Sequence, residues 1–441
     1  MQRSARTGRP ATRHGDDPAV VIGGGAVGLC IAHYLAAAGV PVEVIEQETV
    51  GSGASGGNAG WVCRSHSAPV PAPGVIRYAL RSLGRPDSPL YVRASADLGF
   101  LRWAWRFWRS CTRSQFRKGY AALAELNRPT FELFRELADR GVDTTLRNPG
   151  IVHAFLSVAK ARHHLDVQRA NAGAGYEVPN DVSVGDAAHA LDAALSADVA
   201  AAYLVPEEGI VEPDRFVRSV AASLVASGGV VHERLSVTGF EREHGAVTAV
   251  RTSRGDRRCS AVVIAAGVWS AGLVDKLGYR LPLRSGKGYS FSVGLEPAPR
   301  RPLYLGDKRI VVTPMQGLVR LAGTMELNGN DGQLDWRRIV AIAEGSRYYL
   351  GRWYDDPREL RDLIRDPWVG GRPLLPDGLP VLDRIEDYGN VFLATGHGML
   401  GITLAPASGK ALADYLVTGR RPELLQPFRF DRFGRRATSR G

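Results

Sequence analysis

A glycine-rich turn between two apolar runs near the amino terminus constrains the fold most strongly. Residues 19–23 (AVVIG) predict a buried strand, and apolar residues then recur at helical spacing from Val27 to Ala38, followed by Gly39. A second apolar run, Val42 to Ile45, completes a βαβ unit within about 30 residues. This unit predicts a parallel sheet with helices packed on it, and therefore an α/β fold class.

The turn inside this unit has the spacing of a dinucleotide-binding fingerprint. Gly23, Gly25 and Gly28 form G-x-G-x-x-G between the strand and the helix. Gly23 permits the tight turn, Gly25 lets backbone amides approach a pyrophosphate, and Gly28 lets the helix pack closely on the strand. The start of the helix, with Ala26 and Val27, is predicted to attract the phosphates.

Glu46 extends this prediction to the ribose of the cofactor. It ends the second strand, where a carboxylate can accept hydrogen bonds from a ribose diol. The same carboxylate would repel a 2′-phosphate, which disfavours NADP. The fingerprint alone does not distinguish FAD from NAD.

The predicted secondary structure changes twice in the middle of the chain, first to mainly helical and then back to alternating strands and helices. Residues 100–205 are predicted to be mainly helical, with helices at Thr130–Arg140, capped by Gly141, and at Ala159–Ala172. From residue 213 an α/β pattern returns. It predicts a helix at Asp214–Ser227, a strand pair at Val230–His232 and Val247–Thr252, and a strand at Ala261–Ala266.

The carboxyl-terminal part combines both architectures. Residues 288–326 alternate strand-like runs with turn residues, which is typical of an antiparallel sheet. Residues 391–395 (VFLAT) predict a strand, followed by a glycine-rich turn and a helix over residues 405–416. Two domains are therefore expected for a chain of 441 residues.

Composition argues against nucleic-acid binding and against a spanning helix. The net charge is +11, but residues 1–18 contribute +2 and residues 420–441 contribute +5. We interpret these ends as basic tails and expect no nucleic-acid partner. No apolar run approaches the roughly 20 residues that cross a bilayer. The four cysteines, Cys30, Cys63, Cys111 and Cys259, lack metal-ligand spacing, so no metal is expected and a reducing cytoplasm fits.

Further segments resemble a known family when taken together. They are SGGNAG (55–60), VIAAGVW (263–269), KGYS (287–290), RLAGTMEL (320–327), GGRPLLPDGLPVL (370–382) and TGHGMLGITLAPASGKALADYL (395–416). The set resembles the amine- and amino-acid-oxidising flavoproteins that include D-amino-acid dehydrogenase, glycine oxidase and sarcosine oxidase, and most of all the bacterial D-amino-acid dehydrogenases. The similarity runs from Ala19 to about Phe433.

This resemblance implies FAD as the cofactor and a particular domain organisation. A Rossmann-like FAD-binding domain of the glutathione-reductase type is expected in residues 19–99, 206–285 and 377–433. An interleaved α+β substrate domain, built on an antiparallel sheet, is expected in residues 100–205 and 286–376. Residues 1–18 and 434–441 remain as tails.

The resemblance also implies a set of site residues. Arg372 matches the family arginine that holds the substrate carboxylate, a role that suits a planar guanidinium. The turn after Thr395 is placed to supply backbone amides to the flavin. The remaining predicted FAD-binding residues are Ser55, Asn58, Ala59, Gly60, Ala266, Gly267, Trp269, Gly396, Gly398, Met399, Gly401, Ile402 and Thr403.

Several residues near the predicted site have two interpretations. His397 either contacts the flavin or hydrogen-bonds the backbone, and His66 has the same ambiguity. Tyr289 and Tyr304 are pocket candidates, although aromatic residues on strands are more often packed in a core. His163 and His164 are predicted to lie on a solvated helix face.

The segment FLRWAWRFWRSC (100–111) places Arg102, Arg106 and Arg109 on one stripe of a helix that also carries Trp103, Trp105 and Trp108. Such a helix either covers the substrate domain or lies on an anionic membrane, and the sequence favours the internal cover. The expected localisation is cytoplasmic, with peripheral contact at the inner face of the cell membrane as the alternative that a membrane-bound helix implies.

The expected reaction is the oxidative deamination of an amino acid, with a D-amino acid as the leading candidate. Hydride transfer from Cα to flavin N5 gives an imino acid, which hydrolyses to a keto acid and ammonia. Oxidation of a secondary amine, such as proline, hydroxyproline or sarcosine, is the alternative. A flavin-carrying subunit of an electron-transfer complex is a third candidate. Quinone, oxygen and a redox protein all remain candidates for the electron acceptor.

Overall fold

A computed structural model describes residues 17–81, 90–92, 97–172, 175–327 and 332–434. The predicted tails therefore lie almost entirely outside the described residues. The helices are α1 (Ala26–Ala37), α2 (Val75–Arg81), α3 (Leu98–Ser110), α4 (Arg113–Asn127), α5 (Thr130–Asp139), α6 (Val158–Asn171), α7 (Asp186–His189), α8 (Pro213–Ala226), α9 (Ser270–Lys276), α10 (Trp336–Leu350), α11 (Leu360–Leu363) and α12 (Ala405–Thr418).

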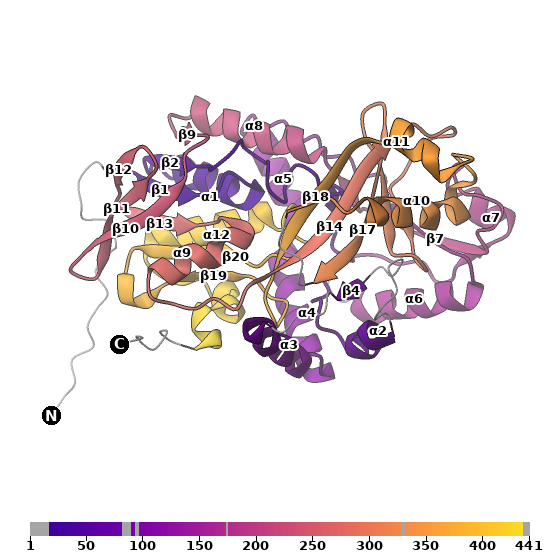
Figure 1. The fold of residues 1–441 in the computed structure, drawn as a ribbon, viewed down its shortest axis with the longest axis horizontal. Coiled ribbons are helices and arrows are strands. Elements are labelled where there is room, and N and C mark those ends of the chain that lie inside the picture. The colour runs from indigo at the N-terminus through magenta and orange to yellow at the C-terminus, as the bar shows by residue number, and fades with distance from the viewer. Residues whose placement is uncertain (1–16, 82–89, 93–96, 173–174, 328–331, 435–441) are drawn as a thin grey trace.

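The strands form two large sheets and two small ones within the described residues (Figure 1). The strands are β1 (Ala19–Ile22), β2 (Val42–Ile45), β3 (Trp61–Val62), β4 (Leu90–Val92), β5 (Ile151–Phe155), β6 (Ser183–Val184), β7 (Ala201–Val205), β8 (Gly209–Ile210), β9 (Val230–His232), β10 (Val237–Glu243), β11 (Ala246–Thr252), β12 (Gly255–Arg258), β13 (Ala261–Ile264), β14 (Arg284–Val293), β15 (Leu303–Leu305), β16 (Ile310–Pro314), β17 (Val319–Leu327), β18 (Arg365–Leu374), β19 (Val381–Arg384) and β20 (Val391–Thr395).

The first large sheet has the order β19-β20-β13-β1-β2-β9 and is parallel except for β19. Alternate residues of β1 face opposite layers, as a strand requires. Val21 packs with α1, α8 and α12, whereas Val20 and Ile22 pack with α9 and the three-stranded sheet β10-β11-β12. The predicted parallel sheet and α/β fold class are confirmed.

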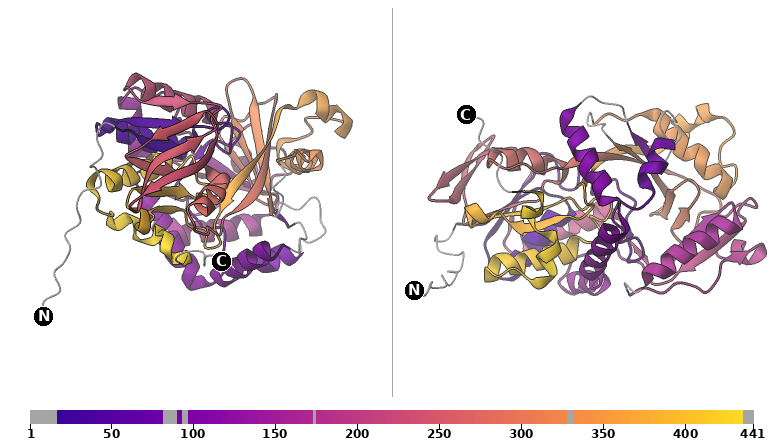
Figure 2. Two further views of the ribbon diagram at one scale, coloured as in Figure 1. Left: turned by 60° about the vertical axis from the view of Figure 1, so that its left-hand side comes forward. Right: turned by 90° about the horizontal axis from the view of Figure 1, so that it is seen from below.

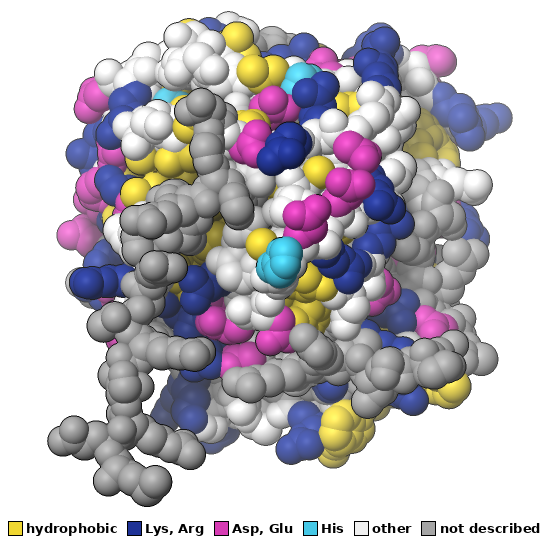
Figure 3. All heavy atoms as spheres, turned by 90° about the vertical axis from the view of Figure 1, so that its left-hand side faces the viewer, with side chains coloured by type: hydrophobic (Ala, Val, Ile, Leu, Met, Phe, Trp, Pro, Cys, Tyr) yellow, Lys and Arg dark blue, Asp and Glu magenta, His cyan; other side chains and the backbone are white. Residues whose placement is uncertain are grey.

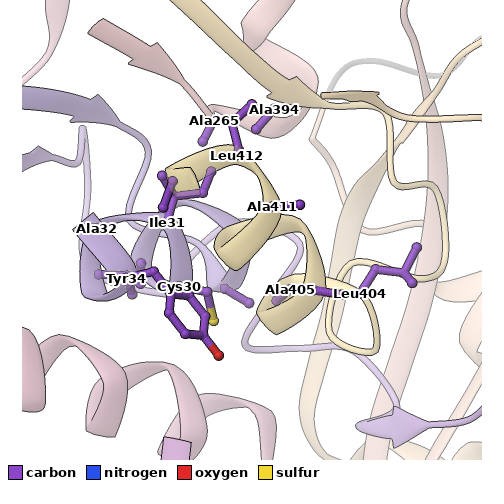
Figure 4. Packing of buried hydrophobic residues seen from close by; sticks show 14 of the residues in the cluster. Cys30, Ile31, Ala32, Tyr34, Ala265, Ala394, Leu404, Ala405, Ala411 and Leu412 are labelled. Carbon is purple, nitrogen blue, oxygen red and sulfur yellow. The ribbon is translucent and has the colours of Figure 1, made fainter. Parts of the chain in front are cut away.

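The helical layer under this sheet is closely packed. Gly409 of α12 lies against Cys30 of α1, and a Cβ at Gly409 would lie 2.8 Å from the Cys30 carbonyl carbon. Ile31 and Tyr34 of α1 meet Ala411 and Leu412 of α12 in one apolar cluster (Figure 4). This packing fixes the amino end of α1 and the turn before α12 at the same edge of the sheet.

The second large sheet has the order β18-β14-β17-β16-β15-β5-β7-β6, with β4 paired to the end of β17. Its neighbours are antiparallel except for β15 with β5 and β17 with β4. One face carries α10, whose Ile339 and Ile342 pack with Tyr289 and Phe291. The predicted antiparallel sheet is confirmed, and the two views of Figure 2 show it beside the parallel sheet.

Two predictions about the strands need correction. Residues 100–205 are not mainly helical throughout, because β5 and β7 extend the second sheet. Val230–His232 and Val247–Thr252 are strands, but they do not pair. β9 joins β2, whereas β11 joins β10 and β12. β5 and β9 pair with strands far away in sequence, which local periodicity does not specify, whereas β11 pairs with its immediate neighbours.

The predicted domain boundaries stay a proposal, and two segments cross them. β4 lies in the segment expected for the cofactor domain but pairs with β17 of the second sheet. Leu123 and Leu126 of α4 and Phe134 of α5 lie in the apolar cluster of α1 and α12, although both helices were expected in the substrate domain. We propose to shift the boundaries accordingly.

The surface at the end of the parallel sheet mixes charges of both signs. Lys and Arg side chains alternate there with Asp and Glu side chains and a few apolar ones (Figure 3). This mixed surface contrasts with α2 and α3, at the lower edge of Figure 1 and in front in the right panel of Figure 2. Neither helix carries an acidic residue.

Candidate active site

A cavity of about 1110 Å³ lies between the carboxyl ends of the parallel strands and one face of the second sheet. In open α/β sheets, ligands bind at this edge. The predicted site residues that line the cavity are Gly23, Gly25, Ala26, Val27, Glu46, Ser55, Asn58, Ala59, Gly60, Ala266, Gly267, Trp269, Tyr289, Tyr304, Arg372, His397, Gly398, Met399, Gly401, Ile402 and Thr403.

Two of the predicted residues, Gly28 and Gly396, do not line the cavity but shape its edge. A Cβ at Gly28 would lie 2.1 Å from the Gly23 carbonyl oxygen, so glycine allows α1 to pack on the turn. Gly396 has a φ of +88°, and a Cβ there would lie 2.3 Å from Leu375. Both glycines allow the backbone conformation that places neighbouring residues at the cavity, and neither contributes to the cavity wall itself.

The end of the cavity at α1 fits a dinucleotide. Gly25 stands at the amino end of α1, and the amide of Ala26 donates to Ser55 Oγ at 3.0 Å. The Glu46 carboxylate accepts from the amides of Gly24 at 2.8 Å and Glu48 at 3.0 Å, which holds it at the strand end. A helix amino end and a fixed carboxylate are the two groups that pyrophosphate and ribose require.

The loop of residues 55–60 is fixed over the second sheet by side chains that the sequence did not reveal. Arg320 donates to the carbonyls of Gly56 at 3.1 Å and Asn58 at 2.9 Å, and Ser290 Oγ donates to Gly57 O at 2.6 Å. A Cβ at Gly57 would lie 2.1 Å from the Trp368 indole. The glycines in this loop therefore permit a close approach between the two sheets.

One row of residues crosses the second sheet under the cavity, and we call it the cavity floor. In register from β18 to β15, it consists of Trp368, Ser290, Ala322, Val311 and Tyr304. Because residues two apart on a strand share a face, Arg372 and Thr324 lie on the same side of the sheet as this row.

Arg372 lies on the cavity wall with its guanidinium over β14. The ideal Cβ position of Gly288 is 2.2 Å from the Arg372 guanidinium carbon, so only glycine leaves room there. Nη1 donates to Thr324 O at 2.9 Å. Burial lowers the pKa of Arg372 to about 10. Within the described residues no carboxylate pairs with this cation, so an anionic group of a ligand would have both charge and geometry to bind it.

The other predicted catalytic residues differ in their environments. Tyr289 is fully buried, and its hydroxyl donates to Glu326 at 2.8 Å, which commits it to the core of the second sheet. His397 Nε2 lies 3.0 Å from Ser408 Oγ, and burial lowers the pKa of His397 to about 4. Tyr304 projects from the cavity floor toward Trp61 and His66.

Tyr304 belongs to a group of rings at one end of the cavity, which we call the ring cluster: Trp61, His66, His153, His164, Tyr203 and Tyr304. Burial lowers the pKa of both His66 and His164 to about 4. His163 is exposed as predicted, but the prediction for His164 is wrong. His164 lies on the buried side of α6, with its Nδ1 2.5 Å from the Tyr203 hydroxyl.

These buried imidazoles predict acid sensitivity. Burial lowers the pKa of His66, His164 and His397 to about 4, whereas an unfolded chain binds their protons near 6.5. The unfolded state then binds more protons, so stability falls as the pH drops from about 6.5 to 4, by about 3 kcal/mol for His397 alone. Glu208 acts oppositely, because burial raises its pKa to about 7.

Urea unfolding at pH 7.5, 6.5 and 5.5 tests this balance. We expect the free energy of unfolding to decrease at each step, since three histidines outweigh one glutamate. His163→Phe should leave the slope unchanged and His397→Phe should flatten it. A free energy of unfolding that rises toward pH 5.5 would contradict the neutral state of the buried imidazoles.

The matching family model is described as FAD dependent oxidoreductase and covers residues 19–415. The chain is 31% identical to a D-amino acid dehydrogenase of Cereibacter sphaeroides over 420 residues, which cover 92% of each chain. It is 29% identical to a D-amino acid dehydrogenase of Granulibacter bethesdensis over 412 residues, covering 92% of this chain and 96% of the relative.

Solved structures show the same fold at lower identity. Glycine oxidase from Bacillus cereus has a TM-score of 0.70 at 23% identity, covering 93% of this chain and 97% of that one. L-proline dehydrogenase from P. horikoshii has a TM-score of 0.72 at 18% identity, covering 95% and 98%. With the extent of the family match, these findings lead to one conclusion: the chain belongs to the family of FAD-dependent oxidoreductases.

Proposed function

We propose that the protein oxidises an amino acid at the carbon that bears the amino group, and that the substrate is a D-amino acid. The observation that carries this proposal is the Arg372 guanidinium, which lies in the cavity without a carboxylate partner among the described residues. A substrate carboxylate would complete a bidentate charge-assisted pair there. The curated relatives named D-amino acid dehydrogenase support the choice of enantiomer.

The residues of the chain would position the substrate. FAD, when bound, accepts two electrons and a hydrogen from the substrate as a hydride. Arg372 would hold the carboxylate, and its strand is tied to the turn before α12, because the amide of Gly398 donates to Pro373 O at 3.0 Å. Thr395 Oγ1 donates to Gly267 O at 2.9 Å and joins the two glycine turns. A fixed orientation of Cα supplies much of the rate.

Anaerobic mixing of the FAD-loaded protein with D-, L- and N-alkyl amino acids tests the reaction. We expect D-amino acids to bleach the visible flavin band fastest. Faster bleaching by N-methyl amino acids or proline would replace the proposal with secondary-amine oxidation. No bleaching by any of them would overturn it in favour of a flavin-carrying subunit. Reoxidation with oxygen, a soluble quinone or a redox protein then identifies the acceptor.

We also propose that α2 and α3 rest on an anionic membrane surface, with a membrane quinone as the acceptor. No described helix is long and apolar enough to cross a bilayer. Phe100, Trp103 and Phe107 of α3 are buried, as the predicted internal cover requires. Trp105 and Trp108, however, are 53% and 57% exposed. With five arginines on the two helices, Arg77, Arg81, Arg102, Arg106 and Arg109, they suit an interfacial helix.

Co-sedimentation with vesicles tests this contact. The wild type should bind vesicles that contain phosphatidylglycerol and should be released by high salt, because the attraction is electrostatic. W105S/W108S should reduce binding at least about tenfold, since each indole contributes roughly 1 kcal/mol or more of apolar burial. Tyr348→Ser, which changes an exposed aromatic residue of α10, is the control. Equal binding of all three proteins would refute the contact.

A further inference from the structure

The ring cluster lies at a definite distance from Arg372. Arg372 Nη1 reaches Thr324 O on β17, and Tyr304 stands on β15, two strands further along the sheet. Thr324 lies two residues along β17 from Ala322, which is in register with Tyr304, so at about 4.8 Å per strand and about 3.3 Å per residue the two backbone positions are roughly 12 Å apart. A methyl side chain of an amino acid held by its carboxylate at Arg372 does not reach the cluster. An aromatic side chain does, because Tyr304 and His66 project into the gap.

Three rings of the cluster contact one another and form part of the cavity wall. Trp61, His66 and Tyr304 meet pairwise edge to face, with interplanar angles of 76°, 65° and 73° and centroid distances of 5.3 to 6.5 Å. All three line the cavity. An aromatic ring bound against these side chains could make both stacked and edge-to-face contacts, which are the geometries that aromatic pairs prefer.

His66 brings an imidazole to this wall, and its tautomer depends on the hydrogen bond to Ser65. The Glu208 carboxylate accepts from the amides of Arg64 at 2.9 Å and Ser65 at 2.8 Å. Ser65 Oγ lies 3.0 Å from His66 Nδ1. A Ser65 hydroxyl that donates to the neighbouring Glu208 carboxylate accepts from Nδ1–H, and this tautomer of His66 presents a lone pair at Nε2.

A cationic side chain matches this end of the cavity poorly, because Arg309, which lines the cavity near His164, would repel it. The buried imidazoles are neutral at pH 8, so they supply no charge of their own. The described histidines do not form a metal-binding group either. A neutral ring with an O–H or N–H donor satisfies both the rings and Nε2.

We propose that the ring cluster is the pocket for the substrate side chain, and that it selects amino acids whose side chain is an aromatic ring with a hydrogen-bond donor, namely a phenol or an indole. The assignment rests on the proposed function only in placing the substrate carboxylate at Arg372. Trp61, His66 and Tyr304 enclose the ring, and His66 Nε2 accepts its hydrogen bond.

Calorimetric titration with carboxylic acids that lack the amino group tests the pocket without turnover. At pH 8 the FAD-loaded protein is titrated with 3-(4-hydroxyphenyl)propionate, 3-phenylpropionate and propionate. We expect both ring acids to bind at least about tenfold more tightly than propionate, because a ring buries far more apolar surface. The hydroxyl should add about another fivefold through one hydrogen bond.

His66→Phe keeps a ring of similar size but removes the acceptor. It should bind 3-phenylpropionate as the wild type does and lose the preference for the hydroxyl. Tyr304→Ala should weaken both ring acids, and His163→Phe, on the exposed side of α6, should change nothing. Equal binding of propionate and the ring acids, no binding of any acid, or a hydroxyl preference that survives in His66→Phe would overturn the assignment.

Turnover separates this inference from the proposed function. If amino acids fail to bleach the flavin while the ring acids still bind selectively, the reaction is wrong and the pocket stands. If D-alanine bleaches the flavin as fast as D-tyrosine and the ring acids show no advantage, the reaction stands and the pocket is wrong.

Discussion

Replacing Arg372 by methionine should raise the KM for the amino acid by two orders of magnitude or more while FAD stays bound. The substitution keeps an unbranched apolar stem above Gly288 but removes the guanidinium. A substrate carboxylate would then be desolvated in the cavity without a cation, and removal of one partner from such a buried pair costs about 3–5 kcal/mol. That cost corresponds to roughly a hundredfold to several thousandfold in binding.

A second substitution at Arg372 shows whether substrate affinity depends on the charge alone or also on the paired donors, and a variant at Arg365 is the control. Arg372→Lys keeps the charge but not the two parallel donors, so we expect it to recover only part of the affinity. Arg365→Met removes an exposed arginine from the same strand and should leave the kinetics unchanged. The measurement is steady-state kinetics together with the ratio of flavin to protein absorbance. An unchanged KM in Arg372→Met would remove this residue from the carboxylate role.

The elements that the sequence predicted well are those with local signals. The boundaries of β2, β9 and β20 agree with the predicted ones, and α1 begins after the predicted glycine turn. In each case a short apolar run is bounded by glycine, proline or charged residues within a few positions. Such signals need no information about distant partners.

Pairing between distant segments was not predictable in the same way. β5 and β7 lie in a region with strong helical patterns. β5 pairs with β15, about 150 residues later, and β7 joins the second sheet by pairing with β5. β10 was missed altogether. The same limit explains why Val230–His232 was assigned the wrong partner.

Contacts between distant segments also determine which side chains meet in the site, and local sequence patterns do not predict them. Arg372 lies in a recognisable motif that predicts its role, whereas no local signal marks Trp368, four residues earlier, which packs against Gly57 from the other end of the chain. His163 and His164 are neighbours on a helix, so their side chains point about 100° apart. Only the fold determines that His164 is the one that meets Tyr203.

Gly25→Val is expected to yield folded protein without its yellow colour. Of the three fingerprint glycines, only Gly25 can be replaced in a way that should block FAD binding without distorting the backbone. A Cβ at Gly23 would lie 2.5 Å from Ala265 O, and one at Gly28 would lie 2.1 Å from Gly23 O, so those substitutions distort the backbone. Gly25 has a φ of −82°, which any residue adopts, and a Cβ there meets only Ser55 Oγ, at 3.1 Å.

The larger side chain would instead occupy the space in which a pyrophosphate approaches the amino end of α1. Loss of two charge-assisted hydrogen bonds to phosphate costs about 3 kcal/mol or more, at least roughly a hundredfold in FAD affinity. Gly294→Val, at a site with open space, is the control. Thermal unfolding of the FAD-free proteins should coincide, whereas only Gly25→Val should fail to gain a flavin band on adding FAD. A fully flavinated Gly25→Val would mean that the pyrophosphate lies elsewhere.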